Sequence, residues 1–228
     1  MMVNPPNEVL DRLRNMADPA NVAGMARFGI NPENTLGISI PALRSIAKEI
    51  GKDHVLAQEL WASGIHEARI LAAFIDDPIQ VTEAQMERWA AEFDSWDVCD
   101  QVCGNLFDRT PFAFQKALDW SSRETEFVKR AGFALMAWLA VHDKKAKDDR
   151  FEIFLPAIIQ QSTDNRNYVR KAVNWALRNI GKRNRSLNWR AIETAEEVAR
   201  IDSKTAHWIA SDALKELTSL AIQSRLKN

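Results

Sequence analysis

The chain has 228 residues, of which 46% are hydrophobic, and only eight Gly and eight Pro, a composition that excludes a disordered or fibrous protein. The formal net charge of −1 says nothing by itself about partners. No basic start followed by an apolar stretch opens the chain, and the longest uncharged apolar run, 131–141, is too short to cross a bilayer. We therefore expect a cytoplasmic protein with no signal peptide and no membrane partner.

Apolar residues recur at three- and four-residue spacing along almost the whole chain, which predicts an all-α protein. The first clear helix follows Ser39, has Pro41 in its first turn and stops at Gly51. Further helices are expected at about 54–63, 66–75, 82–92, 96–107, 111–121, 124–141, 149–161, 166–180, 188–200 and 203–222. The connections are short and none is typical of an interdomain linker, so we expect a single domain over residues 1–228.

Several of these helices share one sequence pattern, in which a polar or basic start is followed by alternating small and large apolar residues. The segments are HEARILAAFI (66–75), EFVKRAGFALMAWL (126–139), NYVRKAVNWALRNIG (167–181) and TAHWIASDALKEL (205–217). If Arg69, Arg130, Lys171 and Ile209 are equivalent, the intervals are 61, 41 and 38 residues, and Asp100 divides the first interval. Repeats of about 40 residues built from helix pairs are typical of HEAT-like solenoids. We therefore predict a HEAT-like helical-repeat solenoid, an α-α superhelix.

The charges are unevenly distributed. Residues 1–122 hold 10 Lys/Arg against 18 Asp/Glu, whereas residues 123–190 hold 15 against 7. The stretch 166–190 has no acidic residue, and such a block favours a polyanionic partner, although a solvated helix face is the alternative. We expect its cations to line a basic groove on the concave face and to bind DNA: Arg166, Arg170, Lys171, Arg178, Lys182, Arg183 and Arg185, with Arg190 completing the block.

Candidate chemistry lies in the segment DSWDVCDQVCGNLF (94–107). Trp96 and Asp100 are four residues apart and so share one helical face. A carboxylate beside an indole has little water around it, which suits acid/base or cation-stabilising work. An Asp that caps the helix, with a Trp packed in the core, is the alternative interpretation. Arg130 and Trp175 support the first, because a buried Arg130 would be an unpaired charge and Trp175 lies among basic residues.

We expect neither a metal nor a cofactor. Cys99 and Cys103 lie on one helical face and have no second Cys/His pair, so we expect two buried, apolar side chains. No Gly-rich phosphate loop and no Gly-x-Ser-x-Gly element occurs. The four histidines are scattered, and we expect His66 and His142 to be ordinary surface residues. Four tryptophans are expected in the core: Trp61, Trp89, Trp120 and Trp138.

Over most of its length the chain resembles the bacterial HEAT-like-repeat alkylpurine DNA glycosylases of the AlkD type. The resemblance lies in TLGISIPALRSIAKEI (35–50), SWDVCD, FVKRAGFAL and YVRKAVNWALR, in the family's order. The resemblance implies that Asp100 is the catalytic carboxylate, that the rings of Trp96 and Trp175 contact the deoxyribose, and that Arg130 holds the DNA backbone. Ser95 stands where the family often has a second aromatic residue, which bears on substrate range.

The function implied by this resemblance is hydrolysis of the N-glycosidic bond of cationic alkylated purines in duplex DNA. N3-methyladenine and N7-methylguanine are such bases, and the resemblance implies that they are removed without a tight base-flipping pocket. A cationic base already leaves easily, so a carboxylate that stabilises the sugar cation and activates water is sufficient. We expect a monomer that acts on double-stranded DNA. The alternative is a non-catalytic HEAT-like module that binds DNA or a protein.

Overall fold

The computed structural model describes residues 5–226, and within this range the chain forms helices and no strands, which confirms the all-α class. The chain divides into two compact units, residues 1–110 (unit 1) and 111–228 (unit 2). Among the described residues, no helix combines the length and apolar character needed to cross a membrane. A single domain and a concave groove both depend on how the two units join, so they stay predictions.

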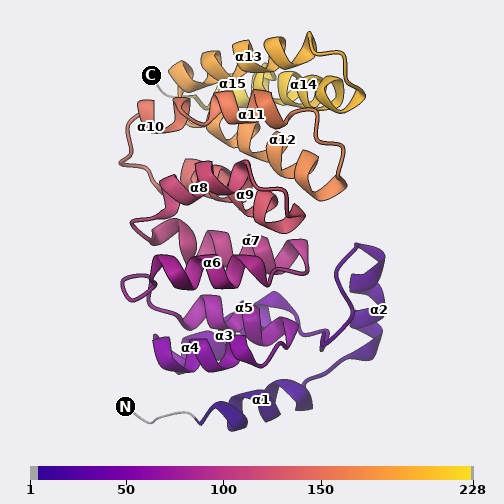
Figure 1. The fold of residues 1–228 in the computed structure, drawn as a ribbon, viewed down its shortest axis with the longest axis vertical. Helices are drawn as coiled ribbons and strands as arrows, with labels where there is room; N and C mark the ends of the chain where they lie inside the picture. The colour runs from indigo at the N-terminus through magenta and orange to yellow at the C-terminus, as the bar shows by residue number, and fades with distance from the viewer. Residues whose placement is uncertain (1–4, 227–228) are drawn as a thin grey trace. The chain divides into compact units, whose positions relative to one another are not determined.

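Unit 1 consists of helices in two rows. Its elements are α1 (Pro6–Asn15), α2 (Pro19–Arg27), α3 (Ile40–Ile50), α4 (His54–Ala62), α5 (His66–Ile75), α6 (Glu83–Ala91), α7 (Trp96–Asn105) and the 3₁₀ turn η1 (Phe107–Arg109). Helix α5 packs between α3 and α7, and α4 covers α5 (Figure 1). Trp61 of α4 stacks face to face on Trp89 of α6, with the ring centroids 4.0 Å apart, and this contact joins α4 to α6 in the second row.

The structure adds two helices before the first one that the sequence predicts. Helix α3 follows Ser39 and ends at Gly51 as expected. Both α1 and α2 begin with a proline in the first turn, and the carboxylate of Asp18 caps α2. No residue of α2 is buried, so α2 lacks the apolar stripe by which a helix is recognised in a sequence.

A buried carboxylate fixes the loop before α3. Glu67, at the start of α5, is only 1% exposed. Its side chain accepts hydrogen bonds from the backbone N–H groups of Leu36, Gly37 and Ile38, at 2.8, 2.6 and 3.2 Å respectively. Burial of a carboxylate is costly unless hydrogen bonds compensate for the lost water, and these three N–H groups supply them. The N–H group of Asp18 then donates to the carbonyl of Leu36 at 2.7 Å, which ties α2 to the same loop.

Replacement of Gly37 by Ala is expected to destabilise unit 1. Gly37 has a φ of +81°, and a Cβ atom there would lie 2.3 Å from the backbone oxygen of Asp18. Gly64→Ala is the matched control, because Gly64 has a φ of +70° but no atom within 4 Å of the position that a Cβ atom would take. Both variants should lose about 1–2 kcal/mol through backbone strain, and Gly37→Ala a further 1–3 kcal/mol or so through the clash. Urea unfolding measures the difference, and equal losses would contradict the packing argument.

Unit 2 is built from helix pairs. Its elements are α8 (Ala113–Ser121), α9 (Glu126–His142), α10 (Asp149–Glu152), α11 (Leu155–Gln161), α12 (Asn167–Gly181), α13 (Arg185–Ala199), α14 (Lys204–Leu217) and α15 (Leu220–Gln223). Helix α12 packs against α9, α13 and α14, so α9, α12 and α14 form one row and α8, α11 and α13 the other (Figure 1). The pairs α8–α9, α11–α12 and α13–α14 are therefore successive repeats.

The contacts between successive repeats keep a constant register in unit 2. The side chains of Arg130, Asn174 and Arg178 each bond a residue 38 positions later in the chain. This spacing confirms the predicted repeat of about 40 residues and places its equivalent positions on the second helix of each pair. In unit 1 the corresponding contact joins His66 to Asp97, 31 positions later.

Two of the expected helices are interrupted. The segment expected at 149–161 is split into α10 and α11, with Pro156 in the first turn of α11. The segment expected at 203–222 ends at Leu217, and α15 starts again after Ser219, whose side chain caps it. Helix α13 begins before its expected start at residue 188, because Asn184 caps it through the N–H group of Leu187.

Candidate functional site

Trp96 is the first residue of α7 and is held by the end of α2. Its indole N–H group donates a hydrogen bond to the carbonyl oxygen of Phe28 at 3.1 Å. The ring of Phe28 itself is 77% exposed, and no pattern in the sequence marks this position. Trp96 is half-buried, so the alternative in which it fills the core is wrong. The hydrogen bond to Phe28 therefore fixes the N–H edge of the indole.

The buried and accessible residues of α7 lie on opposite sides of the helix. Val98, Cys99, Val102 and Cys103 are buried, whereas the motif residues and Gln101 and Asn105 are only partly covered. The residue at the N-cap of α7 is Ser95, and Asp97 is the acid in its first turn. Asp100 lies a full turn into the helix, so it is not a capping residue.

The carboxylate of Asp97 is held by two side chains of unit 1, those of His66 and Ser95. One carboxylate oxygen lies 2.9 Å from Nε2 of His66, and the other accepts a hydrogen bond from the hydroxyl of Ser95 at 2.5 Å. His66, at the start of α5, is 4% exposed. The expectation of a surface histidine was therefore wrong, because its partner lies one repeat away and is invisible to local spacing. Ser95, which stands where the resembling family often has an aromatic residue, is buried, and its hydroxyl helps to hold the carboxylate of Asp97.

The charges of this pair support each other. Burial lowers the pKa of His66, but the hydrogen bond to Asp97 and its negative charge outweigh burial and raise the pKa above the ordinary value. Burial likewise raises the pKa of Asp97, but the hydrogen bond and charge of His66, with the hydroxyl of Ser95, hold it below the ordinary value. Each group thus favours the charged form of the other, and their contact fixes the start of α7 against α5.

The stability from this pair should depend on pH at both ends. Because the pKa of folded His66 is raised, its contribution is complete below its unfolded pKa near 6.5 and is lost as the pH rises through the folded value. Because the pKa of folded Asp97 is lowered, its contribution is complete above its unfolded pKa near 3.8 and is lost as the pH falls through the folded value. Asp97→Asn should therefore cost about 1–3 kcal/mol between these limits and less outside them.

Urea unfolding of wild type and Asp97→Asn across this pH range measures the effect. Asp11→Asn is the control, because Asp11 forms an exposed ion pair with Arg14 in the same unit and its loss should cost little. A loss in Asp97→Asn that does not change with pH would contradict the ion pair.

In unit 2, Arg130 is buried near the start of α9 and is 6% exposed. Its guanidinium donates a hydrogen bond to the carbonyl oxygen of Tyr168, in the first turn of α12, at 2.7 Å. Burial therefore does not leave the charge unsatisfied, as the sequence argument assumed, because a backbone carbonyl accepts from it. Its contact with the DNA backbone stays a prediction.

Trp175 belongs to an aromatic cluster in unit 2. It is half-buried on α12 and meets Trp138 of α9 edge to face, with centroids 5.3 Å apart. Trp138 in turn stacks on His142 at 4.8 Å. The expected core position of Trp138 is therefore wrong, since it is only half-buried. The other three tryptophans expected in the core are almost completely covered: Trp61, Trp89 and Trp120.

Four of the eight cations in the basic stretch 166–190 pair with acids that lie outside it in sequence: Arg166, Arg178, Lys182 and Arg190. Arg166 pairs with Asp164 at 2.5 Å. Glu216 of α14 accepts from Arg178 at 2.6 Å and from Lys182 at 2.9 Å. A window of sequence therefore overstates the positive charge of this face, because neighbouring repeats bring acids to it.

The remaining cations of the stretch differ in accessibility. Arg183 donates to the carbonyls of Ala140 and Ala146 and lies 3.8 Å from the ring centroid of Phe151, and burial lowers its pKa. It holds the end of α9. Arg170 lies over the ring of Trp208, at 5.2 Å from its centroid. Lys171 and Arg185 are exposed, and neither has a carboxylate within 4 Å in the described part of the chain.

The two cysteines lie on the buried side of α7. Cys99 and Cys103 are both covered, as expected, and burial raises the pKa of the Cys103 thiol. Within residues 5–226, no group of three or more His, Cys, Asp or Glu side chains is arranged to hold a metal ion. The side chains of α7 that remain accessible are therefore its carboxylates, amides and indole.

Comparison with known proteins identifies a family and a solved structure with a similar fold. The model of a family described as DNA alkylation repair enzyme matches residues 9–217. A solved structure described as a new family of proteins related to the HEAT-like repeat DNA glycosylases, with affinity for branched DNA structures, has a TM-score of 0.75. It is 22% identical, and the match covers 94% of this chain and 96% of that chain. The HEAT-like repeat fold is thereby confirmed.

An engineered protein of 13% identity matches 95% of this chain and 99% of its own length, but its TM-score is only 0.38. The search of curated proteins finds no match.

Proposed function

The chain belongs to the family of DNA alkylation repair enzymes, and from this premise we propose that it is a DNA glycosylase for cationic alkylated purines. The proposed reaction is hydrolysis of the N-glycosidic bond of bases such as N3-methyladenine and N7-methylguanine in duplex DNA. The proposed mechanism uses neither a metal nor a cofactor, and a cytoplasmic monomer is sufficient for it.

The different situations of the two carboxylates on α7 carry this proposal. Asp97 is committed to His66 and Ser95, and its charge is used to fix the start of the helix. Asp100 follows one turn later on the less buried side of α7, which Trp96 also borders. These contacts suit Asp97 to a positioning role. We propose Asp100 as the catalytic group because it is partly accessible and shares its side of α7 with Trp96.

The proposed task of Asp100 is electrostatic stabilisation of the developing sugar cation and activation of the attacking water. Because an alkylated purine carries a positive charge, the base leaves as a neutral species and needs no strong general acid. The water loses its proton to the carboxylate as its oxygen bonds to C1′ of the sugar. The electron pair of the N-glycosidic bond stays with the departing base.

Aromatic and cationic side chains complete the proposal. The rings of Trp96 and Trp175 are proposed to contact the deoxyribose, where an indole face attracts the partly positive sugar. Arg130 is proposed to hold the backbone near the lesion. The most direct phosphate contacts are proposed for the exposed Lys171 and Arg185.

Four further cations would reach phosphates by exchanging their carboxylate, amide or aromatic partners for DNA: Arg166, Arg170, Arg178 and Lys182. Arg183 is proposed to act by holding the end of α9, since its guanidinium is occupied by two carbonyl oxygens.

Asp100→Asn is expected to lower the rate of base release at least about 100-fold, because the neutral amide neither stabilises the sugar cation nor accepts the proton of water. The substrate is duplex DNA with a single N7-methylguanine, and alkali converts each abasic product into a strand break that a gel resolves. Asp202→Asn is the control, because it makes the same chemical change at an exposed loop position. Full activity of Asp100→Asn in a folded protein would refute the role of this carboxylate.

A second function is favoured by one observation, the affinity for branched DNA ascribed to the protein with the similar fold. In this alternative, the chain binds DNA junctions and releases no base. A four-way junction and a linear duplex of equal length, each titrated at several salt concentrations, separate the two functions. Preferential binding of the junction, together with no abasic product from methylated duplex, would establish the alternative.

A further inference from the structure

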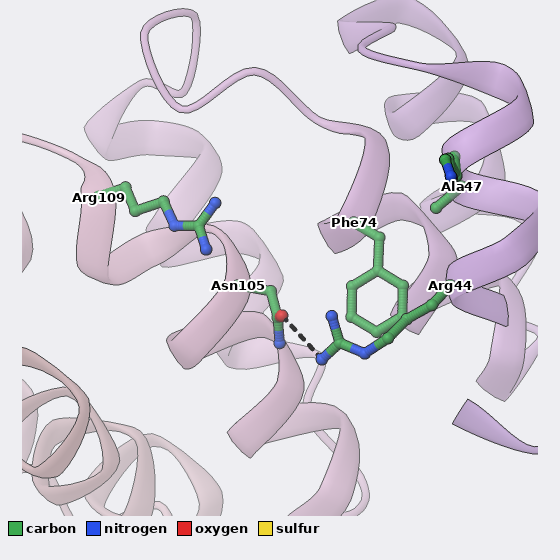
Figure 2. Close-up of a pocket in the computed structure, with 6 residues that line it drawn as sticks. Arg44, Ala47, Phe74, Asn105 and Arg109 are labelled. Carbon is green, nitrogen blue, oxygen red and sulfur yellow. Dashed lines mark hydrogen bonds between the residues drawn. The ribbon is translucent and has the colours of Figure 1, made fainter. Parts of the chain in front are cut away.

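Unit 1 contains a cavity of about 260 Å³ among α3, α5, α7 and η1. Figure 2 shows the side chains that converge on it from these four elements. Helix α3 contributes three residues, and the other elements contribute one each: Arg44, Ala47 and Lys48 from α3, Phe74 from α5, Asn105 from α7 and Arg109 from η1. None of these residues belongs to the basic stretch 166–190 or to the Trp-Asp-x-x-Asp motif.

The charge of this cavity is opposite to that of the unit around it. Residues 1–110 hold nine Lys/Arg against 17 Asp/Glu, yet three of those nine cations line the cavity and no carboxylate does. Within the described part of the chain, Arg44 and Lys48 have no carboxylate within 4 Å, and the nearest to Arg109 is that of Asp108, at 3.9 Å. The cavity is therefore a positively charged spot in an acidic unit.

Arg44 is already oriented toward the cavity. Its guanidinium lies 4.5 Å from the ring centroid of Phe74 and donates one hydrogen bond to Oδ1 of Asn105 at 3.1 Å (Figure 2). A guanidinium has five N–H donors, so this single hydrogen bond leaves others for a ligand. Stacking on an aromatic ring also reduces the conformational entropy that ligand binding would cost. A planar, oriented guanidinium is the group that recognises phosphate oxygens best.

Lys52 adds a further positive charge close by. Its ammonium group donates to the backbone carbonyls of Phe74, at 3.1 Å, and Asp76, at 2.6 Å. Burial lowers the pKa of Lys52, the positive charge of Arg109 lowers it further, and the carboxylates of Asp76 and Asp77 act in the opposite direction. Lys52 and Arg109 thus repel each other, and an anion bound between them would relieve this repulsion.

We propose that this cavity binds a phosphate group of the DNA backbone. The inference rests on the proposed function, because that function brings a duplex to α7. Asn105 follows Asp100 by five residues, or about 7.5 Å along the helix axis, a distance of about two nucleotide steps at 3.4 Å per step. The two residues are about 140° apart around the axis, but both lie on the less buried side of α7. A strand that follows this side from a lesion at Asp100 would bring a phosphate a few nucleotides away to Arg44, Lys48 and Arg109.

The test uses Arg44→Gln, and Arg88→Gln is its matched control. Arg88 is also an exposed arginine of unit 1 whose guanidinium donates to a side-chain amide, that of Gln58 at 2.8 Å, but it does not line the cavity. Both variants lose one positive charge. Fluorescence anisotropy with an unmodified duplex, over a range of NaCl concentrations, measures affinity and its salt dependence without requiring base release.

Arg44→Gln should bind the duplex about tenfold more weakly, and the slope of log K against log salt should become shallower by about 0.9. Arg88→Gln should match the wild type in both quantities. If circular dichroism shows that Arg44→Gln is not folded, Lys48→Gln replaces it, with the same expectation. Wild-type affinity and slope in a folded cavity variant would overturn the proposal while leaving the glycosylase assay unaffected.

Inorganic phosphate distinguishes a backbone phosphate from a free one. Thermal unfolding in phosphate and in chloride at equal ionic strength is compared for the wild type and Arg44→Gln. If phosphate stabilises only the wild type but duplex binding is equal in both, the cavity takes free phosphate and the backbone assignment is wrong. If the wild type binds no DNA, the cavity proposal fails together with DNA binding, and the assay of base release then decides the proposed function separately.

Discussion

The arrangement of unit 1 depends on two neighbouring buried side chains in the first turn of α5. Glu67 accepts three backbone N–H groups from residues 36–38, and this fixes the loop between α2 and α3. Nε2 of His66 lies 2.9 Å from a carboxylate oxygen of Asp97, which fixes the start of α7. The backbone N–H group of His66 donates to the carbonyl oxygen of Asn34. Because both side chains are polar and almost fully buried, loss of a partner would leave a buried polar group unsatisfied, and these contacts therefore position the loop and α7.

Most of the fold could be predicted from the sequence because apolar periodicity and capping residues are local signals. The helices from α3 to α9 lie close to their expected limits, and the repeat interval follows from equivalent positions on successive second helices. Helix α2 was not predicted because none of its residues is buried. The breaks at Pro156 and Ser219 were not predicted because the apolar period of the sequence continues through them. Local pattern thus indicates where a helix can form, but it does not show which of its residues are covered.

The candidate site was harder to predict because its side chains are defined by contacts one repeat away. Spacing alone places Trp96 and Asp100 on one face of α7, but it does not show that Asp97 is committed to His66. The same limit applies to charge. The stretch 166–190 contains no acid, yet Glu216 neutralises two of its cations from the next repeat, whereas the acidic first half contains a cavity lined by three cations. In this protein, electrostatic partners thus lie one repeat apart in sequence, as His66 and Asp97 do in unit 1 and Arg178 and Glu216 in unit 2.

The two cysteines of α7 give this helix an internal chemical reporter. Cys99 and Cys103 are completely buried; Cys99 directly precedes Asp100, and Cys103 follows it by three residues. A thiol-reactive reagent can reach them only when the cover of α7 opens, and the rate of modification therefore reports the free energy of the least costly opening that exposes them. The helix that carries the proposed catalytic carboxylate can therefore be followed through its native thiols, without an introduced cysteine, as ligands, salt or substitutions change its packing in unit 1.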